Sequence, residues 1–148
     1  MTERTSEIRP AAARDLEDIE RLLSEDSLPI DGVAESLHGF LVAVNGEDVV
    51  GAVGIESCGE YGLLRSAVVD ANARNRGIGR QLVERAIDSA REHKLKGLYL
   101  LTTTAEAYFP LFGFEVTSRE DAPDVIRQTS EFTTACPASA TLMKLDLR

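Results

Sequence analysis

The segment most suggestive of chemistry is a loop rich in glycine and arginine at positions 74–80, which opens into an amphipathic helix. Gly77 and Gly79 carry no side chain, so an anion can approach the backbone closely. The unpaired amides and positive dipole of a helix N-terminus bind phosphate. Arg74, Arg76 and Arg80 add positive charge. We therefore expect a pyrophosphate-binding loop formed by Arg74, Asn75, Arg76, Gly77, Ile78, Gly79 and Arg80.

The spacing of the glycines and their neighbours excludes two other kinds of phosphate-binding loop. A dinucleotide-binding loop requires Gly-x-Gly-x-x-Gly, and residues 81–84 supply no third glycine. A P-loop requires Gly-Lys-Ser/Thr, which this sequence lacks. An ordinary tight turn before a helix is the remaining alternative if the two glycines are considered alone.

The composition narrows the function classes. The chain is 43% hydrophobic and carries 25 acidic against 16 basic residues, a net charge of −9. This balance argues against a nucleic-acid partner, which requires a basic face. The N-terminus is polar, and no run approaches the roughly 18 apolar residues of a membrane span. We expect one domain over residues 1–148, cytoplasmic and without a membrane partner. No metal site or disulfide framework is expected from the spacing of Cys58, Cys136, His38 and His93.

The periodicity of apolar residues changes along the chain between that of strands and that of helices. A short first strand is expected to end at residues 8–10. Further strand patterns cover residues 40–44, 49–55, 61–69, 97–104, 114–117 and 140–147. Asn45-Gly46 predicts a hairpin between the second and third of these. Helical spacing covers 15–23 and 79–92, with shorter helices expected at 33–37, 105–112 and 122–127. This order predicts an α/β (α+β) fold with a mixed central sheet and helices on both faces.

Two motifs in this framework resemble the GNAT superfamily of N-acetyltransferases. Its signature, Gln/Arg-x-x-Gly-x-Gly/Ala at the head of the central helix, is matched by Arg74, Gly77 and Gly79. Residues 107–114 (AYFPLFGF) are similar to its Phe-Tyr-x-x-x-Gly-Phe segment. The element order also fits, so the resemblance covers essentially the whole chain. It implies a mostly antiparallel sheet of about six or seven strands, with acetyl-coenzyme A (acetyl-CoA) as co-substrate.

The resemblance also implies where the thioester binds. In the superfamily it lies in a wedge between two splayed parallel strands, here residues 63–69 and 98–104. The expected pantetheine contacts are backbone groups of Ala67, Val68 and Val69, and the amide of about Val68 would polarise the acetyl carbonyl. Thr104 and Phe109 complete the expected cofactor contacts. The amine would attack directly, so neither cysteine is expected to act as a nucleophile.

The resemblance does not assign the general base and the general acid to single residues. The superfamily's glutamate position falls near Leu63, and the nearest acids upstream are Glu56 and Glu60, either of which could act as base. We take Glu60 as the candidate, a solvated turn carboxylate being the alternative. The superfamily's tyrosine position falls on Phe109, which has no proton to give. Tyr108, one residue away, is therefore the candidate acid, and water or a nearby threonine hydroxyl could replace it.

The acceptor is suggested by a narrower resemblance. Residues 100–109, 127–129 and the last strand are similar to amino-acid N-acetyltransferases of the N-acetylglutamate-synthase kind. Together with residues 136–140, they look most like the arsenic-resistance N-acetyltransferases. This implies a small acidic amino acid or a glutamate analogue, arsenical or phosphinic. The expected contacts are Arg65, Ser66, Thr102, Thr103 and Arg127, the arginines binding carboxylate or arsonate.

Several readings stay open. Arg65 could be an outward-facing strand residue and Arg127 a surface helix charge. The synthases carry basic residues in the last strand, where this chain has Ala138-Ser139-Ala140, and this argues against glutamate itself. The acceptor could be another amine, such as a protein N-terminus, a polyamine or an aminoglycoside. A non-catalytic CoA-binding module is a further alternative, and the sequence leaves open whether two copies form a homodimer.

Overall fold

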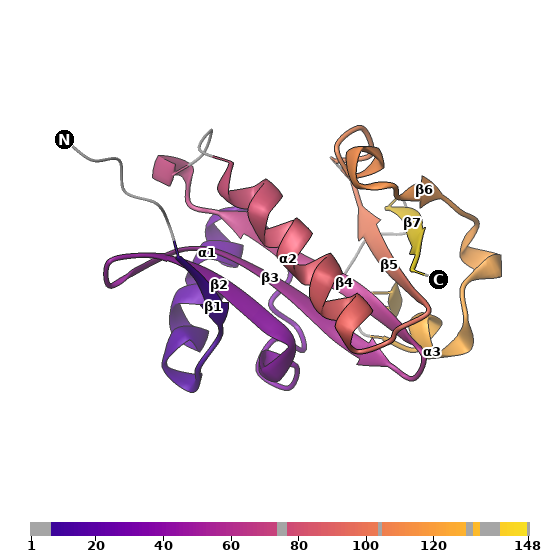
Figure 1. The fold of residues 1–148 in the computed structure, drawn as a ribbon, viewed down its shortest axis with the longest axis horizontal. Coiled ribbons are helices and arrows are strands. Elements are labelled where there is room, and N and C mark those ends of the chain that lie inside the picture. Colours follow the sequence, from indigo (N-terminus) through magenta and orange to yellow (C-terminus); the bar gives the residue numbers. More distant parts are fainter. Residues whose placement is uncertain (1–6, 74–76, 104, 130–131, 134–139, 148) are drawn as a thin grey trace.

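A computed structural model describes residues 7–73, 77–103, 105–129, 132–133 and 140–147. Over these residues seven strands form one mixed sheet in the order β1-β2-β3-β4-β5-β7-β6, in which only β4 and β5 are parallel (Figure 1). The predicted mixed, mostly antiparallel sheet is confirmed. The strands are β1 (Glu7–Pro10), β2 (Phe40–Asn45), β3 (Asp48–Cys58), β4 (Tyr61–Val69), β5 (Gly97–Thr102), β6 (Glu115–Val116) and β7 (Thr141–Asp146).

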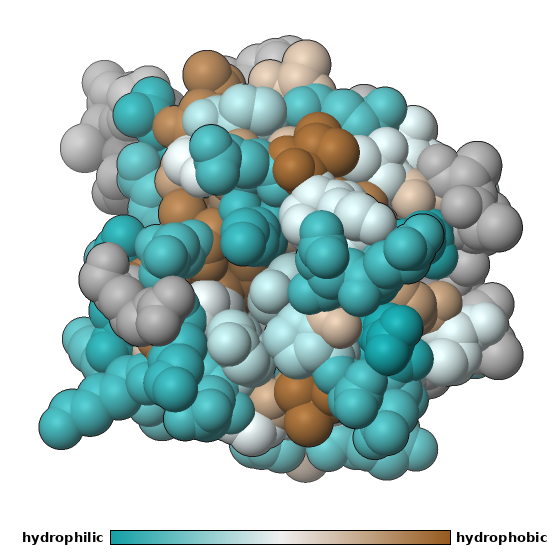
Figure 2. Space-filling model, turned by 90° about the vertical axis from the view of Figure 1, so that its right-hand side faces the viewer, coloured by the Kyte–Doolittle hydropathy of each residue, from teal (hydrophilic) through white to brown (hydrophobic). Residues whose placement is uncertain are grey.

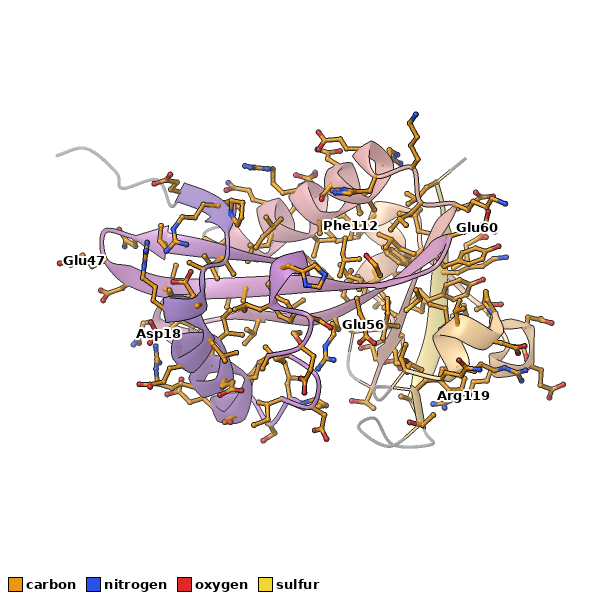
Figure 3. The ribbon with its side chains drawn as sticks, turned by 90° about the horizontal axis from the view of Figure 1, so that it is seen from below. Asp18, Glu47, Glu56, Glu60, Phe112 and Arg119 are labelled. Atoms are coloured by element: carbon orange, nitrogen blue, oxygen red, sulfur yellow. The ribbon has the colours of Figure 1, made fainter. Side chains whose placement is uncertain are left out.

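The two long helices, α1 (Leu16–Glu25) and α2 (Ile78–Glu92), cover opposite faces of the sheet (Figure 3). Each buries an apolar stripe at helical spacing. Side chains alternate along a strand, so Val53 of β3 packs in the α2 cluster while its neighbour Ala52 packs in the α1 cluster. The short helix α3 (Asp124–Arg127) covers a third cluster on the α1 side, over β4, β5 and β7. Helices on both faces are thus confirmed.

Two of the predicted short helices are replaced by tighter turns. Residues 33–36 form turns rather than a helix, followed by a 3₁₀ helix at Leu37–Gly39. Val33 is fully buried in the α1 cluster, so its apolar character reflects packing and not helical periodicity. Of the expected helix at 105–112, only Phe109–Phe112 is helical, as a 3₁₀ turn that ends at Gly113 with φ 99°.

The hairpin prediction needs a small shift. Asn45 still pairs with Asp48 across β2 and β3, so the connection is Gly46-Glu47, with Gly46 at φ 66°. No helix in the described residues is long and apolar enough to cross a membrane.

The face over β6 and α3 is mostly polar, with small separate apolar patches (Figure 2). Large apolar side chains left exposed in the described chain include Leu111, Val116 and Val125. Scattered exposed apolar residues are normal on a soluble surface, so they do not identify a dimer interface.

Candidate active site

The central feature of the site is the separation of β4 from β5. Parallel pairing joins Tyr61, Gly62 and Leu63 to Gly97, Leu98 and Tyr99 and then stops, although both strands continue. Figure 1 shows the two strands diverging beyond that point. A cavity of about 920 Å³ opens between them. Its lining includes Leu64 and Leu100 from the α2 face and Val68 and Leu28 from the α1 face, so the cleft connects the two faces of the sheet.

A β-bulge lies in the part of β4 that lines the cleft. Gly54 pairs with Arg65 and Ala52 with Val68, so one residue of β3 faces two residues of β4, Ser66 and Ala67. Ser66 has φ 60°, which is uncommon for a residue other than glycine. A bulge bends its strand and leaves a residue outside the ladder. The bulge therefore exposes backbone groups of β4 where the strand borders the cleft.

The ladder beyond the bulge shows which amides face the cleft. The amide of Asp70 donates to the carbonyl of Val50 at 2.8 Å. Because amides alternate in direction along a strand, that of Val68 points to β3 and that of Val69 points to the open edge. The Val68 amide, which is expected from the resemblance to polarise the acetyl group, therefore does not face the cleft. The amides of Val69 and of Ala67, which lies in the bulge, are better placed to polarise the acetyl group.

On the α2 face, the cleft is bounded by a helix N-terminus. Gly77, at φ 76°, is the N-cap of α2, and no side chain of the described residues caps the helix. Helix geometry leaves the first amides without intrahelical partners, and Gly77, Ile78 and Gly79 all line the cleft. Arg80 also lines it, with an exposed guanidinium whose Nε is 3.3 Å from Glu84. This end can bind an anion through its backbone.

The other residues of the predicted loop, Arg74, Asn75 and Arg76, lie outside the described residues, as does Thr104.

Tyr108 and Phe109 both line the cleft, on its α2 side. Phe109 is buried, and its ring lies edge-on to that of Tyr108 at 5.3 Å between centroids. The Tyr108 hydroxyl lies 4.0 Å from where a Cβ on Gly79 would be, so it faces the first turn of α2. Burial raises the pKa of Tyr108, as does Glu84, while Arg80 opposes them. Tyr108 therefore presents a protonated hydroxyl to the cleft.

On the opposite face, the cleft is bounded by residues 26–29, which follow α1, and by Arg65. The Arg65 side chain is completely inaccessible to solvent. Its Nε donates to the Ser66 hydroxyl at 3.1 Å, and its Nη1 donates to Glu56 Oε1 at 3.4 Å. An outward-facing strand residue is thereby ruled out for Arg65. Sequence reasoning missed the loop at 26–29, because only the fold brings it to the cleft.

Thr102 and Thr103 also line the cleft, and the Thr102 hydroxyl accepts a hydrogen bond from the Ala105 amide at 3.0 Å. Two other predicted residues do not line it. Glu60 lies in the turn between β3 and β4, where it pairs with Lys96 at 2.9 Å. Arg127 lies on α3 and pairs with Asp124 at 2.8 Å, as a surface helix charge does.

Glu56, unlike Glu60, lies beside the cleft. It faces Leu63 across the β3–β4 ladder, and it contacts the cleft through Arg65. Figure 3 shows Glu56 near the middle of the sheet and Glu60 at the far end of the hairpin.

A nucleophilic cysteine has no support in the described residues. Cys58 is buried, which together with Glu56 raises its pKa to about 11, so its thiol stays protonated and unreactive. Cys136 lies outside the described residues. Within the described residues no group of three or more His, Cys, Asp or Glu side chains could hold a metal ion.

Comparisons with known proteins agree with this geometry. Residues 5–114 match the model of the acetyltransferase (GNAT) family. The chain is 34% identical over 113 residues to an IAA acetyltransferase of Azospirillum brasilense, an alignment covering 70% of this chain and 74% of the relative.

Solved structures share the fold. One is a Mycobacterium tuberculosis protein in complex with CoA (TM-score 0.81, 22% identity, 96% of this chain and 99% of that chain). Another is N-acetylglutamate synthase from Neisseria gonorrhoeae with coenzyme A and N-acetyl-glutamate (TM-score 0.83, 20% identity). The match covers 99% of this chain but only 36% of the synthase. The chain belongs to the acetyltransferase (GNAT) family and is an N-acetyltransferase that uses acetyl-CoA.

Proposed function

We propose that the enzyme acetylates the amine of a small acidic amino acid or glutamate analogue, including arsenical and phosphinic analogues, by direct attack on acetyl-CoA. The observation that carries this proposal is the cleft between β4 and β5, whose wall on the face opposite α2 includes Arg65. Arginine binds carboxylates and similar anions through two parallel hydrogen bonds. An amine acceptor anchored there by an anionic group would extend its nitrogen toward the wedge between β4 and β5.

The other end of the cleft suits acetyl-CoA. Pyrophosphate would bind at the first turn of α2, and the pantetheine arm would lie along β4 as an added strand. The amides of Ala67 and Val69 would stabilise the negative charge that develops on the acetyl oxygen. The nitrogen of the uncharged amine forms a bond to the acetyl carbon, the carbon–sulfur bond breaks, and the departing thiolate takes a proton from the Tyr108 hydroxyl. The proton that the nitrogen loses passes to water, and Tyr108 regains a proton from water.

One observation favours a second class of acceptor. Asp26 lines the same side of the cleft as Arg65 and adds a negative charge there. A cationic amine, such as a polyamine or an aminoglycoside, would be attracted to that carboxylate. The two classes differ in whether their binding depends on Arg65.

The test is an assay of thiol released from acetyl-CoA with a panel of amino acids, arsenical and phosphinic analogues, polyamines and aminoglycosides. We expect release with the amino acids or analogues. Arg65→Lys, which keeps the charge but loses the planar fork, should raise the acceptor KM and leave the acetyl-CoA KM unchanged.

Arg91→Ala is the matched control, because this exposed residue on α2 pairs only weakly with Asp88, at 4.0 Å. It should leave both KM values unchanged. If no amino acid or analogue releases thiol, or if Arg65→Lys alters both KM values equally, the proposed acceptor class is wrong.

A further inference from the structure

Ser66 is a residue of the cleft wall that adopts an unfavourable backbone conformation. It lies in the β4 bulge and lines the cleft, with φ 60°. Glycine adopts this conformation without cost, whereas a residue with a side chain meets a steric penalty there. Such residues cluster at functional sites, and bulges beside active sites redirect side chains. A serine at this position, rather than a glycine, therefore indicates a role for its hydroxyl.

The Ser66 hydroxyl has a hydrogen left to donate. Its oxygen accepts a hydrogen bond from Nε of Arg65 at 3.1 Å. Arginine has no acceptor atom, so the hydroxyl hydrogen must point elsewhere. Among the described residues the hydroxyl makes no other hydrogen bond, and Ser66 is partly exposed. The hydroxyl can therefore donate to a group bound in the cleft.

Arg65 acts on the cleft through this hydroxyl. Its side chain is completely inaccessible to solvent, and its Nη1 donates to Glu56 Oε1 at 3.4 Å. These contacts fix the guanidinium, which in turn limits the directions in which the Ser66 hydroxyl can point. A hydroxyl that accepts from a cation is also a stronger donor, because hydrogen bonds in a chain polarise one another. The buried charge of Arg65 thus favours an anion at Ser66 without touching it.

The place of Ser66 in the chain determines which anionic group it can reach. The amides proposed to hold the acetyl oxygen belong to Ala67 and Val69, and Ser66 immediately precedes Ala67. The attacking nitrogen must approach the acetyl carbon beside these amides. In an α-amino acid the carboxylate is attached to the same carbon as the nitrogen, so it stays next to the nitrogen. The α-carboxylate therefore comes within reach of Ser66, whereas the side-chain acid extends further away.

We propose that the Ser66 hydroxyl donates a hydrogen bond to the α-carboxylate of the amino-acid acceptor, and that Arg65 is the positioning residue that orients this hydroxyl. The inference rests on the proposed function, since it takes an amino acid or its analogue as the acceptor. It goes further by naming the part of the acceptor that is recognised. It also distinguishes α-amino acids from amines that lack a carboxylate.

The test measures the KM of Ser66→Ala for the best acceptor in the panel above. We expect this KM to rise about 10- to 100-fold, the scale of a hydrogen bond to a charged group. The kcat and the acetyl-CoA KM should hardly change, because the bond is made equally before and during the reaction. The rise should be several times smaller for the α-amide of the same acceptor, whose neutral oxygen accepts a weaker hydrogen bond.

Two further variants separate the hydroxyl from the backbone. Ser66→Gly also lacks the hydroxyl but adopts φ 60° freely, so it should unfold at a higher urea concentration than Ser66→Ala and still show the same rise in acceptor KM. Ser57→Ala is the matched control, because this exposed serine of β3 does not line the cleft. It should keep every kinetic constant at the wild-type value.

A double variant tests whether Arg65 acts through Ser66. If it does, combining Arg65→Lys with Ser66→Ala should raise the acceptor KM no more than the larger single change. Effects that multiply would show that Arg65 acts independently and would overturn its positioning role.

The contact itself is overturned if Ser66→Ala keeps the wild-type acceptor KM, if Ser66→Gly restores it, or if the α-amide shows the same rise as the acid. Failure of the proposed function appears instead in the wild-type enzyme, as no thiol release with any amino acid or analogue. In that case the inference is overturned with it.

Discussion

Replacing Tyr108 by phenylalanine tests the chemistry of the cleft with the smallest change available. The substitution removes only the hydroxyl that faces the first turn of α2. The ring contacts with Phe109 and Phe112, at 5.3 and 5.2 Å between centroids, remain possible. Because Tyr108 is 37% exposed, we expect the free energy of unfolding to change by less than about 0.5 kcal/mol.

The expected kinetic effect is larger. A positioned proton donor contributes about 10²–10⁴-fold to the rate of a step. Because Tyr108 is partly exposed, water can take over part of its role, and we expect kcat to fall about 10- to 100-fold, at the lower end of that range. Acetyl-CoA binding, measured by calorimetry, should stay the same, since the proposed cofactor contacts are backbone groups.

The pH dependence follows from the direction of the Tyr108 pKa shift. Burial raises this pKa above the ordinary value of 10, and a proton donor acts only while it is protonated. Raising the pKa therefore extends the active range to higher pH. The ratio of variant to wild-type kcat should stay constant across the neutral range and approach one only where the phenol ionises.

Tyr61→Phe is the matched control, because Tyr61 contacts Tyr99 at 5.8 Å between ring centroids and does not line the cleft. It should keep wild-type kcat. If Tyr108→Phe also keeps wild-type kcat while binding acetyl-CoA normally, Tyr108 packs in the cleft wall and donates no proton.

Three further predictions concern the framework of the site. Gly77→Ala places a side chain on a residue at φ 76°, which costs about 1–2 kcal/mol of unfolding free energy, and calorimetry should show weaker CoA binding as the start of α2 shifts. Gly54→Ala puts a Cβ 2.4 Å from the ring of buried Phe40, so urea unfolding should show a loss of about 1–3 kcal/mol or more. Asp15→Asn weakens a buried pair with Arg9 at 2.8 Å and should cost about 1–3 kcal/mol at neutral pH, by thermal unfolding. The Arg9 hydrogen bond lowers the Asp15 pKa, so the wild-type advantage should be present above about pH 4 and disappear as the pH falls through the lowered value.

The limits of β4 were predictable, but its functional shape was not. The run YGLLRSAVV is buried along most of its length, and the predicted span matches the observed strand. The bulge at Ser66 has no local signal, because serine has no preference for a positive φ. It follows from the register with β3, in which one residue faces two. The direction of the Val68 amide depends on the same register.

Long-range placement also decided which charged residues reach the cleft. Glu56 and Glu60 are four residues apart, but the turn after β3 carries Glu60 to Lys96 while Glu56 stays beside Arg65. Arg127 pairs with Asp124, three residues earlier on the same helix, which any exposed helix could provide. An arginine inside a buried strand was the stronger signal, because a buried charge requires partners.

The two ends of the cleft differ in the kind of group that recognises the substrate. At the α2 end, the first residues of the helix and its glycines line the cleft, so an anion can bind to the backbone there although the whole protein has a net charge of −9. At the other end, Asp26 and Arg65 line the cleft, and Arg65 donates a hydrogen bond to Glu56. Backbone recognition is largely insensitive to substitution, whereas side-chain recognition changes with each residue. Substitutions at the acceptor end should therefore change which amine is acetylated and leave acetyl-CoA binding intact.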